Sequence, residues 1–265
     1  MLENENKAPI NGNMLTNVQY WILKAIDAGL PNRGPSVYEG KSKLVMLLGD
    51  EFLNRIAGKT IVDFGCGYGI EAIEMAQRGA QRVIGVDIRE DVLKTARQNA
   101  FAAGAQNVCS FGSSTNELAE IIVSIDAFEH FADPAGILRI MERLLQPAGE
   151  VLISFGPTWY HPLGGHLFSV FPWAHLMFRE QALIRWRSTF KMDGATRFGE
   201  VAGGLNQITI RRFEELIESS PFRYASMELV PIKSLRYLHH KFTRECTTAL
   251  VRCRLVKRAA GNTQD

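Results

Sequence analysis

The chain has 265 residues, 46% of them hydrophobic and 22% charged, and this ordinary globular composition excludes wholesale disorder. A net charge of +2 gives no general reason to expect nucleic-acid binding. The four cysteines form no Cys-x-x-Cys pair, so neither a zinc site nor a disulfide framework is expected. The N-terminal residues lack the basic start and apolar run of a signal peptide, and glycine, proline and histidine interrupt the most apolar stretch, residues 163–178. We therefore expect a cytoplasmic protein without a membrane span or a metal site.

Two helices are predicted before residue 60. The first covers residues 14–29, where Leu15, Val18, Trp21, Ile22 and Ile26 recur at helical spacing. A second amphipathic helix is expected over residues 42–57, with its leucines on one side.

Strand-like and helical patterns alternate between residues 60 and 155. Strands are predicted at residues 60–64, 82–87, 121–125 and 150–155, and helices at residues 70–78, 90–103 and 134–145. Asp133 is the expected N-cap of the third of these helices, and residues 146–149 are expected to form the turn after it. Short runs of Ile and Val suit strands that are covered on both faces. The pattern predicts an α/β fold with a doubly wound, mostly parallel, Rossmann-like sheet.

The pattern changes after Phe155. Residues 156–206 form an aromatic-rich block that is far too long for an ordinary strand-to-helix connection. A helix at residues 210–218 and strands at 224–230 and 247–256 follow. The expected division is an N-terminal tail and helix (1–39), a cofactor-binding core (40–155), a helical cap insertion (156–206) and the C-terminal part of the core sheet (207–265). The aromatic side chains either cover an apolar acceptor or form the interior of the cap, and the sequence leaves both interpretations open.

A glycine-rich turn joins the first predicted strand of the core to its helix, in the sequence VDFGCGYG at residues 62–69. Glycines let the backbone turn tightly and approach a ligand, and the start of the helix supplies unpaired N–H groups. A dinucleotide fingerprint would require a third glycine at position 70, which is Ile70. Asp63, two residues before Gly65, would repel a pyrophosphate and attract a cation. It suits the ammonium and sulfonium groups of S-adenosylmethionine.

A second acidic residue, Asp87, ends the next predicted strand, 22 residues after Gly65. In doubly wound folds, an acid about 20 residues beyond the glycine-rich turn accepts hydrogen bonds from ribose hydroxyls. The alternative is purely structural: the turn packs a strand against a helix, and Asp87 caps the following helix.

These motifs resemble those of the class I S-adenosylmethionine-dependent methyltransferases, in the broad group that includes small-molecule and quinone-pathway enzymes. The resemblance runs from about residue 40 to residue 155 and rests on VDFGCGYG (62–69), VIGVDI (83–88), IIVSIDAFEHFADP (121–134) and LRIMERLLQPAGEVLISF (138–155). It implies a seven-stranded sheet and S-adenosyl-L-methionine as cofactor. The cofactor-binding residues that it implies are Asp63, Gly65, Cys66, Gly67 and Gly69 for the methionine part, Asp87 for the ribose, Ile88 and Ser113 for the adenine, and Asp126 as a lining residue.

Three histidines are candidates for a general base on the acceptor side. His130 follows the fourth strand of the predicted core, and His161 and His166 lie where the chain leaves the next strand. A histidine near neutrality can take a proton at working pH. The alternative is that these imidazoles only hold the loops together, and His175 is expected to pack inside the cap.

The C-terminal region from residue 220 to residue 258 holds nine Lys and Arg residues against two glutamates. Such an excess of basic residues indicates either a solvated strand face or contact with an anionic surface. Weak contact with a membrane surface is one form of the second interpretation. The favoured hypothesis is an enzyme that methylates an oxygen or nitrogen of a small apolar or aromatic acceptor, with no nucleic acid involved. The alternatives are a methyltransferase of RNA or protein that docks through the basic region, and a non-catalytic cofactor-binding module.

Overall fold

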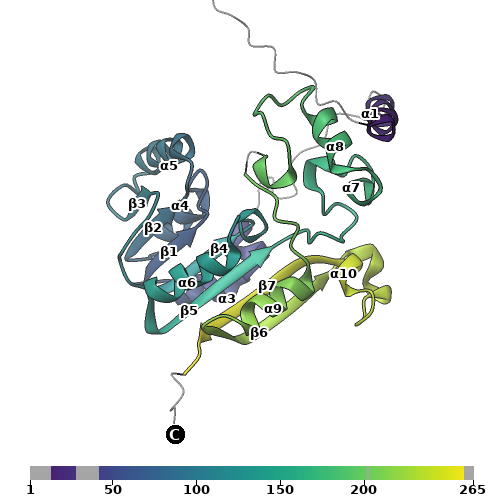
Figure 1. Ribbon diagram of the computed structural model, residues 1–265. Coiled ribbons are helices and arrows are strands. Elements are labelled where there is room, and N and C mark those ends of the chain that lie inside the picture. Colours follow the sequence, from purple (N-terminus) through teal and green to yellow (C-terminus); the bar gives the residue numbers. More distant parts are fainter. Residues whose placement is uncertain (1–12, 28–41, 202, 260–265) are drawn as a thin grey trace, which may run out of the picture.

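The computed structural model describes residues 13–27, 42–201 and 203–259 (Figure 1). Its centre is a seven-stranded sheet in the order β3-β2-β1-β4-β5-β7-β6. The strands are β1 (Thr60–Phe64), β2 (Arg82–Val86), β3 (Cys109–Gly112), β4 (Ala119–Ile125), β5 (Leu145–Phe155), β6 (Phe222–Pro231) and β7 (Thr248–Lys257). Strands β1 to β5 pair in parallel, whereas β7 is antiparallel to both β5 and β6. The predicted Rossmann-like sheet is therefore confirmed, with one antiparallel hairpin at its end.

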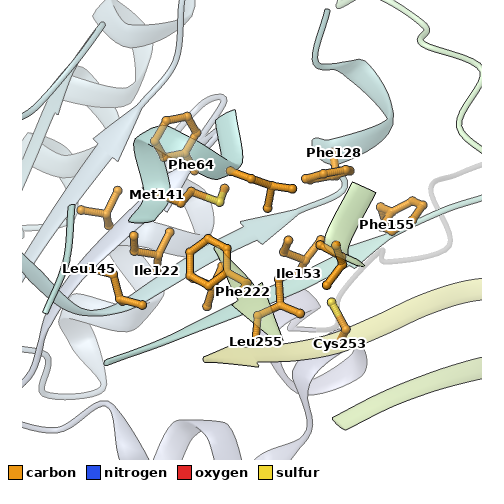
Figure 2. Close-up of a cluster of buried hydrophobic side chains, with 14 of the residues drawn as sticks. Phe64, Ile122, Phe128, Met141, Leu145, Ile153, Phe155, Phe222, Cys253 and Leu255 are labelled. Carbon is orange, nitrogen blue, oxygen red and sulfur yellow. The ribbon is translucent and has the colours of Figure 1, made fainter. Parts of the chain in front are cut away.

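Helices cover both faces of this sheet, as the buried strands require. One face carries α2 (Lys43–Leu48), α3 (Asp50–Arg55), α4 (Ile70–Gln77) and α5 (Glu90–Ala102), and the other carries α6 (Pro134–Leu144) and α9 (Ile210–Glu218). Figure 2 shows part of the cluster under the second face, which includes Met141 from α6 and Ile122 and Ile153 from the sheet. Asp133 caps α6 as predicted, because its carboxylate accepts the Gly136 N–H at 2.9 Å.

The cap insertion has its own buried cluster, apart from the two that flank the sheet. Its elements are short: a 3-10 turn η2 (His166–Phe168), α7 (Ala174–Met177), α8 (Glu180–Arg187) and a second turn η3 (Phe198–Glu200). Phe168, Trp186 and Phe198 are buried in this cluster together with Tyr20 and Leu23 of α1 (Met14–Asp27). Most cap aromatics thus form the interior of the cap.

The predicted first helix is confirmed over Met14–Asp27, the part of residues 14–29 that the structure describes. Most of its apolar residues at helical spacing are exposed (Leu15, Val18, Trp21 and Ile22), while Tyr20 and Leu23 pack into the cap cluster instead. Two other local predictions are wrong. The single helix predicted over residues 42–57 breaks at Gly49, whose φ of +83° leaves the helical region. Residues 146–149 are not a turn but the start of β5, where the pairing with β4 shifts register.

The remaining elements are short. A 3-10 turn, η4 (Lys233–Leu238), and α10 (Arg244–Thr247) lie between β6 and β7. Another 3-10 turn, η1 (Phe128–His130), follows β4. In the described part of the chain, no helix is both long and apolar enough to cross a bilayer.

Candidate cofactor and acceptor site

The predicted cofactor residues gather at one edge of the sheet. The turn containing Gly65 follows β1, Asp87 and Ile88 follow β2, Ser113 follows β3 and Asp126 follows β4. These four strands run in parallel, so their carboxyl ends meet at the same edge. Ile88 is 90% exposed and Ser113 is also exposed, which leaves both accessible to a ligand.

The glycine-rich turn is held tightly against β2. The N–H groups of Gly65 and Cys66 both donate to the Val86 carbonyl oxygen, at 2.8 and 3.1 Å. A Cβ on Gly65, whose φ is +86°, would lie 2.5 Å from the Ala127 Cβ. A Cβ on Gly69 would lie 2.7 Å from the Phe111 ring. Glycine is therefore required at both positions by backbone conformation and by space. Burial raises the pKa of the Cys66 thiol, so Cys66 fills the turn without acting as a nucleophile.

Asp63 lies buried at the end of β1 with an unsatisfied carboxylate. It is 2% exposed, and its Oδ2 atom has no hydrogen-bond partner among the described residues. Burial, and then the charge of Glu71, raise the pKa of Asp63 well above its usual value, while Lys43 opposes the shift. A buried carboxylate without a partner favours an added cation or N–H donor. This orphaned oxygen fits the cationic methionine end of S-adenosylmethionine.

Asp87 has the structural role considered for it in the sequence, and its role toward the ribose stays a prediction. Its carboxylate accepts the backbone N–H of Gly67 at 3.1 Å and that of Arg89 at 3.0 Å, so it ties the glycine-rich turn to the start of α5. The Arg89 guanidinium adds two further hydrogen bonds, each 3.0 Å long. Burial alone would raise the pKa of Asp87, but the hydrogen bonds from Arg89 outweigh it and lower the pKa. Asp87 is therefore a charged acceptor, and Arg89 occupies its outer side.

Lys43 is a site residue that the sequence analysis missed. Its Nζ lies 3.0 Å from Asp126 Oδ2 and 3.7 Å from Glu71 Oε1. Burial would lower the pKa of Lys43, but the charges of Asp126 and Glu71 outweigh it and raise the pKa. Asp126 has a φ of +48°, and its N–H donates to the Ser154 carbonyl at 2.8 Å, so β5 fixes its orientation. No local signal marks Lys43, because it reaches the site only through the packing of α2.

Glu129 is a second missed residue, buried next to the site. It is 2% exposed, and its Oε2 atom has no hydrogen-bond partner in the described part of the chain. Burial raises the pKa of Glu129 to about 8, with a smaller contribution from the charge of Asp126. At neutral pH this side chain therefore carries a proton. The sequence signal is the position of Glu129 next to His130, within the segment IIVSIDAFEHFADP.

The three candidate histidines lie near one another on the cap side, together with His175. The rings of His130 and His166 are 5.3 Å apart between centroids and meet edge to face. His130 bonds the Gly204 carbonyl through Nδ1 at 2.7 Å, and His161 Nδ1 accepts the Leu163 N–H at 2.9 Å. His175 bonds the Trp159 carbonyl and the Ser169 hydroxyl, which confirms that it packs within the cap.

Among the histidines that the structure describes, His166 is the one with a buried ring nitrogen that lacks a partner. Its Nε2 atom is buried and has no hydrogen-bond partner among the residues that the structure describes. The residue also has a φ of +50°, in the left-handed region that a histidine rarely adopts. Burial, and then the neighbouring His130, lower the pKa of His166 to about 4. The imidazole is therefore neutral at pH 7.

The strand order, the glycine-rich turn and the acids after β1 and β2 together define the class I S-adenosylmethionine-dependent methyltransferases. A family model described as a methyltransferase domain matches residues 39–197, more than half of the chain. The chain belongs to this family, and S-adenosyl-L-methionine is its cofactor.

Individual relatives agree with this assignment. The chain is 34% identical over 111 residues to a ubiquinone biosynthesis O-methyltransferase of Stutzerimonas stutzeri. The match covers 40% of this chain and 47% of that protein, so the chain spans about half the length of this curated relative. Two solved structures share the fold. Magnesium protoporphyrin IX methyltransferase of Synechocystis PCC 6803 with bound SAH has a TM-score of 0.52 and 16% identity, covering 92% of this chain and 94% of that one. An S-adenosylmethionine-dependent methyltransferase of Listeria monocytogenes has a TM-score of 0.51 and 15% identity, covering 79% and 97%.

Proposed function

We propose that this protein transfers the methyl group of S-adenosylmethionine to a hydroxyl oxygen of a small apolar or aromatic acceptor. The name of the relative from Stutzerimonas stutzeri, a ubiquinone biosynthesis O-methyltransferase, supports oxygen as the methylated atom. The observation that carries the proposal is the unpartnered Nε2 of His166, which a hydroxyl proton would satisfy.

The cofactor-side residues have distinct tasks in this proposal. Asp63 binds the cationic methionine end, and Asp87 accepts the ribose hydroxyls. Lys43, which pairs with Asp126 and Glu71, is the cation assigned here to the methionine carboxylate. When bound, S-adenosylmethionine supplies a methyl group on positively charged sulfur; the acceptor oxygen bonds to that carbon while the carbon–sulfur bond breaks and its electron pair returns to sulfur.

His166 takes the proton that the acceptor oxygen releases. A base whose pKa is about 4 is weak toward a free phenol, but the acceptor proton becomes strongly acidic as its oxygen bonds to the methyl carbon. His166 therefore accepts it late, during methyl transfer. The edge-to-face contact with His130 holds the ring of His166, and the buried surroundings exclude water.

Two observations count against the alternative functions. Arg244, Arg252, Arg254 and Lys257 of the basic region are paired with glutamates, so much of the charge that would attract RNA is already neutralised. The acids and glycines of the cofactor site are all in place, which counts against a degenerate binding module.

The test is coproduct release from a panel of acceptors that share an aromatic ring. Matched phenols, anilines and their methyl ethers are incubated with the protein and S-adenosylmethionine, and S-adenosylhomocysteine is quantified. We expect turnover with phenols and none with the ethers. Turnover with anilines alone would show that the enzyme methylates nitrogen and not oxygen. Turnover only with RNA or protein would refute the proposal.

A further inference from the structure

The connection between β6 and β7, residues 232–247, lies at the same edge of the sheet as the cofactor and cap residues. β7 is antiparallel to both β5 and β6, so β6 runs in the direction of β5 and ends at the edge where β5 ends. Figure 1 shows the connection as the yellow loop beside α10. Nothing in the proposed methyl transfer uses it.

Three large apolar side chains project from this connection into solvent. Phe242 is 90% exposed, Tyr237 84% and Leu238 59%. Single exposed apolar residues are normal on a protein surface, but three within six positions of one loop are a concentration that indicates an interaction site.

Cations surround these apolar side chains, and no acid is present. Between Glu228 and Glu245 the chain contains four Lys and Arg residues and no Asp or Glu. Arg244 is bound to Glu214, but Lys233, Arg236 and Lys241 are exposed and form no ion pair within the described residues. The guanidinium carbon of Arg236 lies over the Tyr237 ring, 4.6 Å from the ring centroid, so a charged group and an aromatic surface are in contact.

Hydrogen bonds hold the connection in an ordered shape. The Ile232 N–H donates to the Thr247 carbonyl at 2.8 Å and closes its base. The Leu235 N–H donates to the Ile232 carbonyl at 2.8 Å, and the His240 N–H donates to the Thr243 hydroxyl at 3.1 Å. The apolar side chains are therefore presented outward by a fixed backbone, which lowers the entropy lost on binding.

We infer that the β6–β7 connection docks this protein on the surface of an anionic lipid bilayer. Tyr237, Leu238 and Phe242 enter the headgroup region, where amphipathic aromatic and apolar side chains are stabilised, and Lys233, Arg236 and Lys241 bind the lipid phosphates. A bilayer fits better than a nucleic acid, because the leucine and phenylalanine at the tip have apolar surface to bury and no bases to read. Because the connection shares an edge with the cap, docking would bring the acceptor side toward the membrane.

Vesicle sedimentation with the full-length chain tests this inference without reference to methyl transfer. The protein is mixed with phosphatidylcholine vesicles, with and without phosphatidylglycerol, at low and high salt. We expect binding to the anionic vesicles that weakens as salt rises, since surface charges are screened. Binding does not require turnover, so it can succeed if the proposed function fails and can fail if that function holds.

Two triple variants separate the apolar and ionic contributions. Tyr237→Ser, Leu238→Ser and Phe242→Ser together should weaken binding by about tenfold or more at both salts. Lys233→Gln, Arg236→Gln and Lys241→Gln together should weaken it by about a hundredfold at low salt, since each cation near an anionic leaflet contributes about fivefold. Phe101→Ser and Lys94→Gln, at exposed positions on α5, are the matched controls and should bind like the wild type.

Melting curves first establish that each variant folds. Loss of vesicle binding in both triple variants, with unchanged controls, supports the inference. Equal binding by the wild type and both variants would overturn it. The inference would also be overturned if the protein bound no vesicles and the connection bound RNA in a gel shift instead. It would likewise be overturned if the apolar variant changed only the oligomeric state, from dimer to monomer, in sedimentation equilibrium.

Discussion

The two sides of the site differ in the kind of titratable group that they bury. The cofactor side holds carboxylates at the ends of β1, β2 and β4, whereas the cap side holds imidazoles that bond backbone or hydroxyl groups. Burial keeps the imidazoles of His161 and His166 neutral, with a pKa of about 4 for each. The proposed reaction would use this contrast: the acidic side chains would face the cationic donor, and the neutral imidazoles would face the acceptor hydroxyl.

The largest expected effect is on the cap side. Replacing His166→Asn should lower kcat by about a thousandfold, because a general base contributes roughly 10²–10⁴-fold. Cofactor affinity, measured by calorimetry, should stay within about twofold, since the proposal gives His166 a role toward the acceptor and none toward the cofactor. His240→Asn, at an exposed histidine of the β6–β7 connection, is the control. An unchanged kcat in the His166 variant would contradict its role as the general base and leave His130 and His161 as the candidates for that role.

The next effect belongs to the cofactor side. Asp87→Ala should weaken S-adenosylmethionine binding by about a hundredfold, because hydrogen bonds to a charged group each contribute about 1.5–3 kcal/mol. Asp87→Asn keeps an oxygen for the Gly67 N–H, so it separates lost charge from a collapsed turn. Asp91→Ala, at an exposed acid in the first turn of α5, should bind like the wild type. Affinity like that of the wild type in both Asp87 variants would contradict the ribose assignment.

A smaller effect, of opposite sign, is expected at Arg89. Its guanidinium occupies the Asp87 carboxylate that the ribose requires, so Arg89→Ala should tighten cofactor binding by up to about fivefold, as expected for a half-exposed ion pair. The salt dependence of binding should diminish in the same variant. Arg78→Ala removes a comparable ion pair on α4 and is the control. Weaker binding in the Arg89 variant would show instead that the guanidinium helps to hold the cofactor.

The last effect concerns stability and not catalysis: it is the pH dependence that Glu129 causes. Its pKa is about 8 in the folded protein against 4.5 ordinarily, so the folded state retains a proton that the unfolded chain releases. The free energy of unfolding therefore falls as the pH rises from about 4.5 to 8. The buried histidines act oppositely, but only below pH 6.5, so melting curves between pH 6.5 and 8.5 isolate the carboxyl groups.

The matched variants for this pH effect are both Glu→Gln. Glu129→Gln should flatten the decline in Tm above pH 6.5, and Asp63, whose pKa is also raised, accounts for what remains. Glu51→Gln, at an exposed position on α3, should leave the slope unchanged. An identical slope in all three proteins would mean that Glu129 is ionised when folded.

The sequence predicted the core well because its signals are local. The apolar run at residues 60–64 and the glycines after it determine β1 and its turn without help from distant residues. Lys43, a residue that it missed, depends on tertiary packing, because it reaches Asp126 from α2. Periodicity predicted α1 as a helix but not its buried face, since periodicity cannot tell which side of a helix its neighbours will cover. Within the cap, four short helical segments without clear periodicity left no pattern to follow.

The two ends of the cap insertion are joined by a hydrogen bond from the Trp159 N–H to the Ile208 carbonyl, 2.8 Å long. Asn206 then attaches the returning chain to η1 by donating to the carbonyls of Phe128 and Phe131. The segment between these points therefore leaves and rejoins the scaffold at nearly one place. An engineer could exchange it for a segment of different length and shape without stretching the sheet, and so redesign which molecules are methylated while the donor pocket stays as it is.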